Sequence, residues 1–356
     1  MKKRLVIKTG SRVVCDDEGA LSLSILDGLA SQISALRTEG WEIVLVSSGA
    51  VAAGAALAGT DSLQRSDPVT RRQVLAATGQ VRLMQHWQTR FERHHISVAQ
   101  VLASKSDFQT RTHYLNMRNC LEGILTAGIL PIVNENDVVS ITELMFTDND
   151  ELAGLVAGMV NAERLCLLSS VEGVFEADGE RQVIGTWNEA KHRVEDVVSA
   201  GTSQLGRGGM HSKIATARKA ASLGTDAVIA DGRAEGIVLR IAQGQKVGTR
   251  FPARAATSPA KRWLASADDH AAGVVHINEG AARTLQDDSR LASLLMVGVE
   301  ACEGSFKRGD VIRIIAPNGQ VVGCGRAQYD REEADKRIGK RDQKPLVHYD
   351  YLYLSD

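Results

Sequence analysis

The sequence predicts a three-layer α/β/α sandwich with a mostly parallel central sheet, followed by a small β-rich domain. Up to about residue 250, short continuous apolar runs alternate with segments in which apolar residues recur at helical spacing. Strands of a parallel sheet have this pattern because helices cover both faces of the sheet. Beyond about residue 261 the apolar runs are separated by turn residues, which indicates a β-rich fold. A chain of 356 residues is long enough for both domains.

Six apolar runs of the first part are expected to be strands. They are Leu5–Ile7, Ile43–Val46, Val98–Leu102, Ile129–Val133, Leu165–Leu168 and Ala227–Ala230. Helical spacing is clearest between the first two runs and ends before Gly40, a residue typical of helix C-termini. The apolar positions of that helix are Ile25, Leu29, Ile33 and Leu36. Ligands of such sheets bind beyond the carboxyl ends of the strands, so polar residues that directly follow these runs are the functional candidates.

The segment Phe251–Lys261 predicts a linker, because it is small, polar and contains two prolines. Short strands are expected after it, at Val274–Ile277, Val297–Val299, Val311–Ile315 and Val321–Gly325. We therefore predict a first domain over residues 1–252, a linker over residues 253–261 and a β-rich domain over residues 262–356.

Charge and cysteine content exclude several classes of protein. The formal net charge is −1, so the whole chain is not a polyelectrolyte drawn to nucleic acid. The five cysteines form no C-x-x-C pair, which argues for reduced thiols and against a disulfide framework or a zinc site. No apolar run approaches the ~20 residues of a membrane span, and the N-terminal apolar stretch is too short for a signal peptide. A soluble, cytoplasmic protein is expected.

The common phosphate-binding motifs are absent from the sequence. No G-x-x-x-x-G-K-[ST] occurs, and the first expected strand is not followed by G-x-G-x-x-G. The set of motifs that marks protein kinases is missing as well. The sequence therefore gives no support for a P-loop, a dinucleotide-binding fold or a protein kinase.

Two polar or small-residue clusters follow the first two strands. In Lys8–Ser11, the ammonium of Lys8 and the bare backbone of Gly10 could face an anion; the alternative is a solubilising lysine before a turn. In Ser47–Gly54, small side chains would let a ligand approach a helix N-terminus. The alternative for Ser47–Gly54 is close packing of a helix on the sheet.

Three further clusters lie later in the chain. Asn134–Asp137 and Asp148–Asp150 are dense in Asn and Asp, which could hold Mg²⁺, orient lysines or bind an amino-acid substrate; they also form turns and N-caps. Gly206–Lys213 is a glycine-rich loop that enters a helix, either a phosphate cradle or a plain linker. Together the clusters indicate a phosphoryl-transfer site, where a protein mainly positions its substrates and neutralises negative charge.

These clusters, in this order, resemble the amino acid kinase family over almost the whole chain. The motifs that support the resemblance are V-x-S-G-A (Val46–Ala50), I-V-N-E-N-D (Ile132–Asp137), D-N-D (Asp148–Asp150) and G-G-M-x-S-K (Gly208–Lys213). The C-terminal part is similar to a PUA domain, in the segments Lys261–Trp263, Asn278–Ala281 and Phe306–Val311. Within the family, this appendage favours the members that phosphorylate L-glutamate over acetylglutamate kinases and aspartokinases.

The resemblance implies that ATP phosphorylates the γ-carboxylate of L-glutamate, which is the first step of proline biosynthesis. Lys8 and Lys213 would neutralise the charge of the transferred group, and Asp150 would hold both lysines. The positions that match glutamate binding are Ser48, Asp137 and Asn149. A carboxylate is already a nucleophile at neutral pH, which agrees with the lack of a candidate catalytic histidine.

The resemblance further implies ATP with Mg²⁺ and assigns no metal ligand to the protein. The ATP-binding positions would be Lys8, Gly10, Ser169, Ser170, Gly206, Arg207, Gly208, Gly209, Met210, His211, Ser212 and Lys213. The chain departs from the common family pattern at four positions. Relatives often have a small residue at Arg12 and at His211. They often have Asp at Ser170 and Thr at Arg207. These departures concern the nucleotide side of the site.

Partners and alternatives follow from the same resemblance. Relatives are feedback-inhibited by proline and form homodimers or homotetramers. They also pass their acyl phosphate product to a glutamyl phosphate reductase, so proline, further copies of the chain and this reductase are the expected partners. One alternative is a family member that acts on a different carboxylate, a carbamate or a phosphate. Another is an RNA-binding regulatory protein with an inactive kinase domain, because PUA domains otherwise bind RNA. Against it, the basic pairs Lys336-Arg337 and Lys340-Arg341 are mixed with acidic residues.

Overall fold

The computed structural model divides the chain into two compact units, which are described separately. The first comprises Met1–Lys105 and Arg118–Ala256, and the second comprises Ser106–Met117 and Thr257–Asp356. The structure describes residues 3–16, 18–57, 66–109, 111–139, 148–176, 182–199, 209–254, 261–264, 271–287 and 291–354. None of the described helices is long and apolar enough to cross a lipid bilayer.

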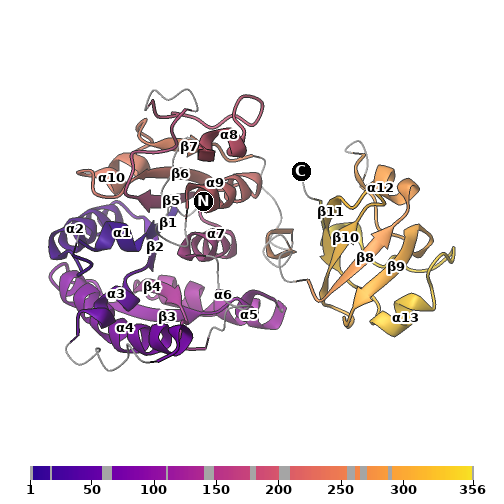
Figure 1. The fold of residues 1–356 in the computed structure, drawn as a ribbon, viewed down its shortest axis with the longest axis horizontal. Coiled ribbons are helices and arrows are strands. Elements are labelled where there is room, and N and C mark those ends of the chain that lie inside the picture. The colour runs from indigo at the N-terminus through magenta and orange to yellow at the C-terminus, as the bar shows by residue number, and fades with distance from the viewer. Residues whose placement is uncertain are drawn as a thin grey trace. The chain divides into compact units, whose positions relative to one another are not determined.

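A seven-stranded sheet forms the centre of the first unit (Figure 1). Its strands are β1 (Arg4–Thr9), β2 (Glu42–Ser47), β3 (Val98–Ala103), β4 (Leu130–Glu135), β5 (Arg164–Ser169), β6 (Asp226–Asp231) and β7 (Thr249–Phe251). They lie in the order β3-β4-β2-β1-β5-β6-β7, and every pair is parallel except β6 and β7. The six predicted strands and the mostly parallel sheet are confirmed. The sequence analysis missed β7, which has only three residues.

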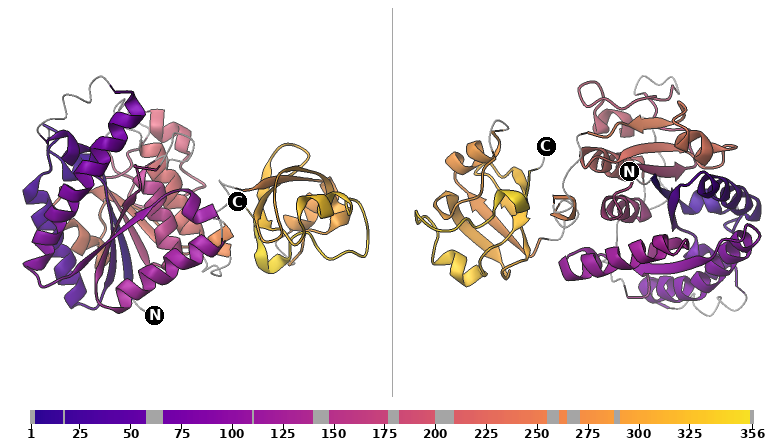
Figure 2. Two further views of the ribbon diagram at one scale, coloured as in Figure 1. Left: turned by 90° about the horizontal axis from the view of Figure 1, so that it is seen from below. Right: turned by 180° about the vertical axis from the view of Figure 1, so that it is seen from behind.

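Helices cover both faces of this sheet, as predicted. The helices of this unit are α1 (Ser11–Val14), α2 (Leu23–Thr38), α3 (Ala50–Ala55), α4 (Pro68–Glu92), the later part of α6 (Arg111–Thr126), α7 (Asn149–Met159), α8 (Val194–Ser199), α9 (Met210–Ser222) and α10 (Ile237–Ala242). Figure 1 shows α2 and α10 on one side of the strands and α7 and α9 on the other, and Figure 2 shows the same layers from behind. The expected end of α2 is confirmed, because Gly40 adopts φ +85° just after the helix. Buried Leu, Ile, Val, Trp and Phe side chains of β1, β2, α2, α4 and α10 form a core on the side of the sheet that α2 and α10 cover.

Two glycines bring α3 and α4 into backbone contact. A Cβ atom at Gly79 of α4 would lie 1.8 Å from the carbonyl oxygen of Ala50, and one at Gly54 of α3 would lie 2.0 Å from that of Leu75. Neither helix could approach the other this closely with a side chain at these positions. Gly54 therefore serves helix packing, which was one of the two alternatives for Ser47–Gly54.

The second unit contains a five-stranded sheet in the order β12-β11-β10-β8-β9, in which only β8 and β10 are parallel neighbours. Its strands are β8 (Gly273–Ile277), β9 (Val299–Gly304), β10 (Val311–Ile315), β11 (Val321–Arg326) and β12 (Leu352–Leu354). Its helices include α5 (Ser106–Gln109), the start of α6 (Arg111–Thr126), α12 (Glu279–Leu285), α13 (Arg331–Asp335) and two 3₁₀ helices, η3 (Met296–Gly298) and η4 (Tyr349–Tyr351). The predicted β-rich C-terminal fold is confirmed.

Three sequence assignments change in the structure. The strand expected at Val297–Val299 is wrong, because its first two residues belong to η3 and β9 begins at Val299. A Cβ atom added at Gly298 of η3 would lie 2.6 Å from the Cβ atom of Ala281. Helix α12, which contains Ala281, therefore packs directly on this turn. Phe251, which was assigned to the linker, ends β7, and Lys261 begins a helical turn over residues 261–264.

Residues 106–117 pack with the C-terminal part of the chain, a feature that the sequence pattern did not indicate. The guanidinium of Arg111 lies 5.1 Å from the ring centre of Trp263, and the Trp263 side chain is almost fully buried. A cation over an aromatic face is attracted by the ring quadrupole. This contact helps to hold the short helical turn of residues 261–264 within the second unit.

Two aspartates cap helices of the first unit in the same way but in different surroundings. Asp67 and Asp148 each accept hydrogen bonds from two backbone N–H groups in the first turns of α4 and α7, respectively. The pKa of the exposed Asp67 carboxyl is held below its ordinary value, mainly by the side-chain and backbone hydrogen bonds of Thr70. Burial raises the pKa of Asp148, and the negative charge of Asp150 raises it further.

Gly79→Ala should destabilise the protein by roughly 1–3 kcal/mol, because the added methyl group meets a backbone carbonyl that no side-chain rotation can move. Gly28→Ala in α2 is the matched control, since a Cβ there has no atom within 4 Å. The control should stabilise by about 0.4–1 kcal/mol. Denaturant unfolding of both variants measures the difference; equal stability of the two would contradict the contact between α3 and α4.

Asp148→Asn should make the protein more stable at pH 7, whereas Asp67→Asn should make it less stable. A raised folded-state pKa means that stability is present below the ordinary carboxyl pKa and is lost as pH rises through the folded value; a depressed pKa has the opposite sign. Asn keeps the cap but removes the charge. The difference for Asp148→Asn should shrink as pH falls toward about 4, whereas the difference for Asp67→Asn should persist to about pH 4 and be lost below it. Unfolding midpoints across this range test the prediction, which fails if Asp148→Asn lowers the midpoint at pH 7.

Candidate functional site

The predicted site residues gather at the carboxyl edge of the seven-stranded sheet. Because β1 pairs in parallel with both β2 and β5, Lys8 lies beside Val46 on one side and Leu167 on the other. The residues that follow these strands therefore meet at one edge, as expected for a parallel sheet. Ser48 directly follows β2 and Ser169 ends β5, so both lie next to the end of β1.

A buried carboxylate joins the two predicted lysines. Lys8 Nζ lies 2.7 Å from Asp150 Oδ1, and Lys213 Nζ donates a hydrogen bond of 2.6 Å to Asp150 Oδ2. Asp150 is 0% exposed, and both lysines are buried. Each residue comes from a different element, namely β1, the first turn of α7 and the first turn of α9. The structure thus brings together the three residues predicted to handle the transferred group.

The electrostatics of this triad favour the charged form of the carboxylate. Burial alone would raise the pKa of Asp150, but the ammonium groups of Lys8 and Lys213 outweigh burial and hold its pKa below the ordinary value. Two cations share one anion here. Lys8 makes no other hydrogen bond or ion pair among the described residues, so its remaining N–H groups can face a ligand. The chemistry of this donor set fits an anionic phosphoryl group.

A chain of amide hydrogen bonds runs from Ser48 across the sheet edge. Asn149 Nδ2 donates to Ser48 Oγ at 2.8 Å and to Asn134 Oδ1 at 2.9 Å. Asn134 Nδ2 in turn donates to Gln80 Oε1 at 2.9 Å. Among the described residues, the buried atoms Asn149 Oδ1 and Gln80 Nε2 have no hydrogen-bond partner. One free acceptor and one free donor are what a polar substrate would need.

Asp137 is held by a residue that the sequence analysis did not single out. Arg72 of α4 donates to Asp137 Oδ1 from Nε at 3.1 Å and from Nη2 at 2.8 Å. Gln80 of the same helix was missed as well. No local signal could have found either residue, because their partners lie 65 and 54 positions away in the chain. Only the packing of α4 places them at the site.

The structure places part of the predicted ATP-binding set. Gly10 is the N-cap of α1, and a Cβ there would lie 3.4 Å from Lys8 Nζ. Ser169 is buried at the end of β5, whereas Ser170 is exposed. Gly209 is the N-cap of α9, and the first four residues of that helix are Met210, His211, Ser212 and Lys213. The predicted positions Gly206, Arg207 and Gly208 lie outside the described residues.

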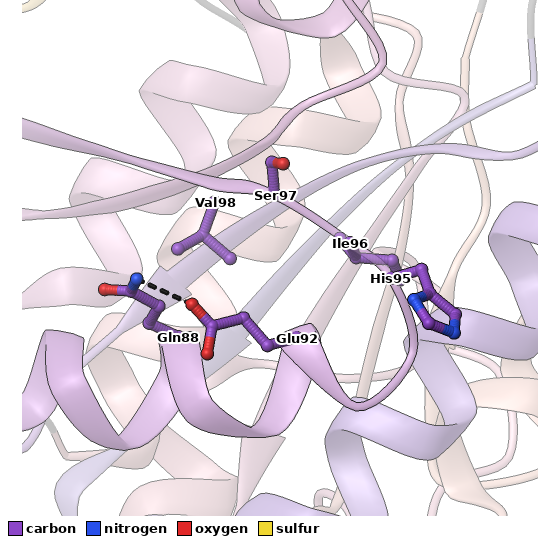
Figure 3. Close-up of a pocket in the computed structure, with 6 residues that line it drawn as sticks. All are labelled: Gln88, Glu92, His95, Ile96, Ser97 and Val98. Atoms are coloured by element: carbon purple, nitrogen blue, oxygen red, sulfur yellow. Dashed lines mark hydrogen bonds between the residues drawn. The ribbon is translucent and has the colours of Figure 1, made fainter.

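A surface pocket of about 560 Å³ lies elsewhere on the first unit, where α4 ends and β3 begins. It is lined by Gln88, Glu92, His95, Ile96, Ser97 and Val98. Figure 3 shows Gln88 Nε2 donating to Glu92 Oε1, at 2.7 Å, across one side of it. The pocket is at the amino end of β3, and none of the predicted site residues lines it. It is therefore separate from the candidate site.

Comparisons with known proteins agree with this geometry. The amino acid kinase family model matches residues 3–231, and the PUA domain model matches residues 273–349. The chain is 45% identical to a glutamate 5-kinase of Chlorobaculum tepidum, over 99% of this chain and 97% of that protein. It is 40% identical to a glutamate 5-kinase of Bacteroides thetaiotaomicron, over 99% of this chain and 98% of that protein.

A solved structure, the UMP kinase of Bacillus anthracis, covers 71% of this chain and 97% of its own with a TM-score of 0.48 and 17% identity. A score this low supports no further argument. The family models and the two near-full-length relatives show to which family the chain belongs. The chain belongs to the amino acid kinase family, among the glutamate 5-kinases, and carries a C-terminal PUA domain.

Proposed function

We propose that this kinase transfers the γ-phosphoryl group of ATP to the γ-carboxylate of L-glutamate, giving γ-glutamyl phosphate and ADP. The observation that supports this most directly is the buried triad of Lys8, Asp150 and Lys213 in a chain related to glutamate 5-kinases over nearly its full length. In this role the enzyme performs the first step of proline biosynthesis.

Charge neutralisation explains how the triad would act. A γ-carboxylate oxygen of glutamate forms a bond to the γ-phosphorus, while the bond to the β,γ-bridging oxygen breaks and ADP leaves with its electron pair. No proton is transferred, so no general base is required. Lys8 and Lys213 would stabilise the negative charge of the group in transit, and Asp150 holds both ammonium groups beside one carboxylate. Mg²⁺ bound to the nucleotide would add positive charge beside the phosphates.

The two sides of the site would hold the two substrates. Ser48, Asp137 and Asn149 lie on the β2 and β4 side of β1 and would bind glutamate. Gly10, Ser169, Ser170 and the start of α9 lie on the β5 side and would bind ATP together with Gly206–Gly208. We assign no side-chain ligand to Mg²⁺, which would be coordinated by phosphate oxygens and water. A homodimeric or homotetrameric assembly, inhibition by proline, hand-over to a reductase and a cytoplasmic location stay predictions.

The substrate prediction can be tested by trapping the acyl phosphate. With ATP, Mg²⁺ and hydroxylamine, the protein should form γ-glutamyl hydroxamate from L-glutamate and hardly any hydroxamate from aspartate or N-acetylglutamate. A preference for either of the other acids would instead favour a family member with a different carboxylate substrate. RNA binding that weakens steeply with salt, in a protein without kinase activity, would favour the regulatory alternative.

Lys8→Ala and Lys213→Ala should each lower kcat by about 10²–10³, because each removes a fixed charge-stabilising donor. Lys246→Ala is the control, since Lys246 is an exposed lysine of the same unit. Both site variants should also unfold at a lower temperature, because Asp150 stays buried with one cation fewer. Rates are therefore measured well below the unfolding midpoint of each variant. A near wild-type kcat in either variant would remove that lysine from the mechanism.

A further inference from the structure

The ion pair between Arg72 and Asp137 leaves one group of each partner available. Both Arg72 Nε and Arg72 Nη2 donate to the same oxygen, Oδ1 of Asp137. Asp137 Oδ2 and Arg72 Nη1 form no hydrogen bond with any other described residue. The Asp137 side chain is 9% exposed and that of Arg72 is 35% exposed. A negative and a positive group therefore lie side by side with unused hydrogen-bonding capacity.

The start of α4 holds this pair in place at two points. Besides Arg72, Gln73 of α4 donates from Nε2 to the carbonyl of Val138 at 3.1 Å. Further along the helix, the close contact at Gly79 fixes α4 against α3, which directly follows the strand that ends at Ser47. The packing of α4 thus holds in place the backbone that carries Arg72.

The chemistry of the proposed acceptor matches this arrangement. The γ-carboxylate of glutamate must reach Lys8 and Lys213. The opposite end of the substrate carries an ammonium and a carboxylate on one carbon, so it is a zwitterion. An adjacent carboxylate and guanidinium, each with a free hydrogen-bonding group, are complementary to that end.

We propose that Arg72 determines specificity by binding the α-carboxylate of glutamate, while Asp137 accepts a hydrogen bond from the α-ammonium. The inference rests on the proposed function, because it assigns one residue to the substrate of that reaction. It also explains why an arginine occupies this position: its planar fork donates to Asp137 and still presents Nη1 to a second carboxylate.

The experiment compares L-glutamate with L-isoglutamine, in which the α-carboxylate is replaced by a neutral carboxamide. Arg72→Gln should raise KM for glutamate by about 10- to 100-fold, as expected for a lost charged hydrogen bond. The values of kcat, KM for ATP and KM for isoglutamine should stay near those of the wild type. The ratio of kcat/KM for glutamate to kcat/KM for isoglutamine should therefore fall in Arg72→Gln. Arg72→Lys, which keeps the charge but not the fork, should give an intermediate KM for glutamate.

Arg71→Gln is the matched control, because it makes the same charge change at an exposed position of the same helix. It should leave both substrate KM values unchanged. If Arg72→Gln raises KM for glutamate and isoglutamine equally, Arg72 acts only by orienting Asp137, and the proposal is overturned. The proposal is also overturned if the ratio of kcat/KM for glutamate to kcat/KM for isoglutamine is the same in Arg72→Gln as in the wild type. Absence of γ-glutamyl hydroxamate with the wild type would instead refute the proposed function, independently of either arginine.

Discussion

The architecture of the candidate site depends on one buried carboxylate. Asp150 has no exposed surface, and burial of an unpaired charge is costly, so it must have cationic partners. Lys8 and Lys213 supply them from β1 and α9. The ion pairs therefore hold the end of a central strand and the starts of two helices in one arrangement. Loss of any member leaves a buried charge without its full complement.

The first turn of α7 connects the two halves of the site. Three successive residues project in different directions, because each helical residue is rotated by roughly 100° from the last. Asp148 caps the helix, Asn149 donates to Ser48 and Asn134, and Asp150 meets the lysines. The charge-handling triad and the amide chain are thus joined through consecutive residues at the start of one helix. In the proposed function, the same helix start aligns the glutamate side with the phosphoryl group.

The raised pKa of Asp148 reflects a local conflict between stability and the site. Its carboxylate is buried close to Asp150, so two negative charges lie near each other at a helix start. Asn would cap α7 equally well without this repulsion. Functional sites commonly retain such unfavourable arrangements while the surrounding structure supplies the stability. The exposed cap at Asp67 has no such conflict.

Much of the fold was predictable, because the signals that determine it are local. Continuous apolar runs marked six strands of the first sheet, and polar clusters after those strands marked its carboxyl edge. The joining of Lys8 and Lys213 through Asp150 was expected from the family resemblance. The short strands β7 and β12 were missed, and η3 was taken for a strand, because three residues carry little periodicity.

By itself the sequence determined the six long strands of the first sheet, the end of the helix before Gly40 and the polar residues that follow those strands, since these depend on neighbours along the chain. The tertiary structure alone decided that Arg72 and Gln80 of α4 reach the site, that Gly54 and Gly79 let α3 and α4 come into backbone contact, and that residues 106–117 pack in the second unit. These features are contacts between residues far apart in sequence. They arise from how whole elements pack, and no local pattern encodes them.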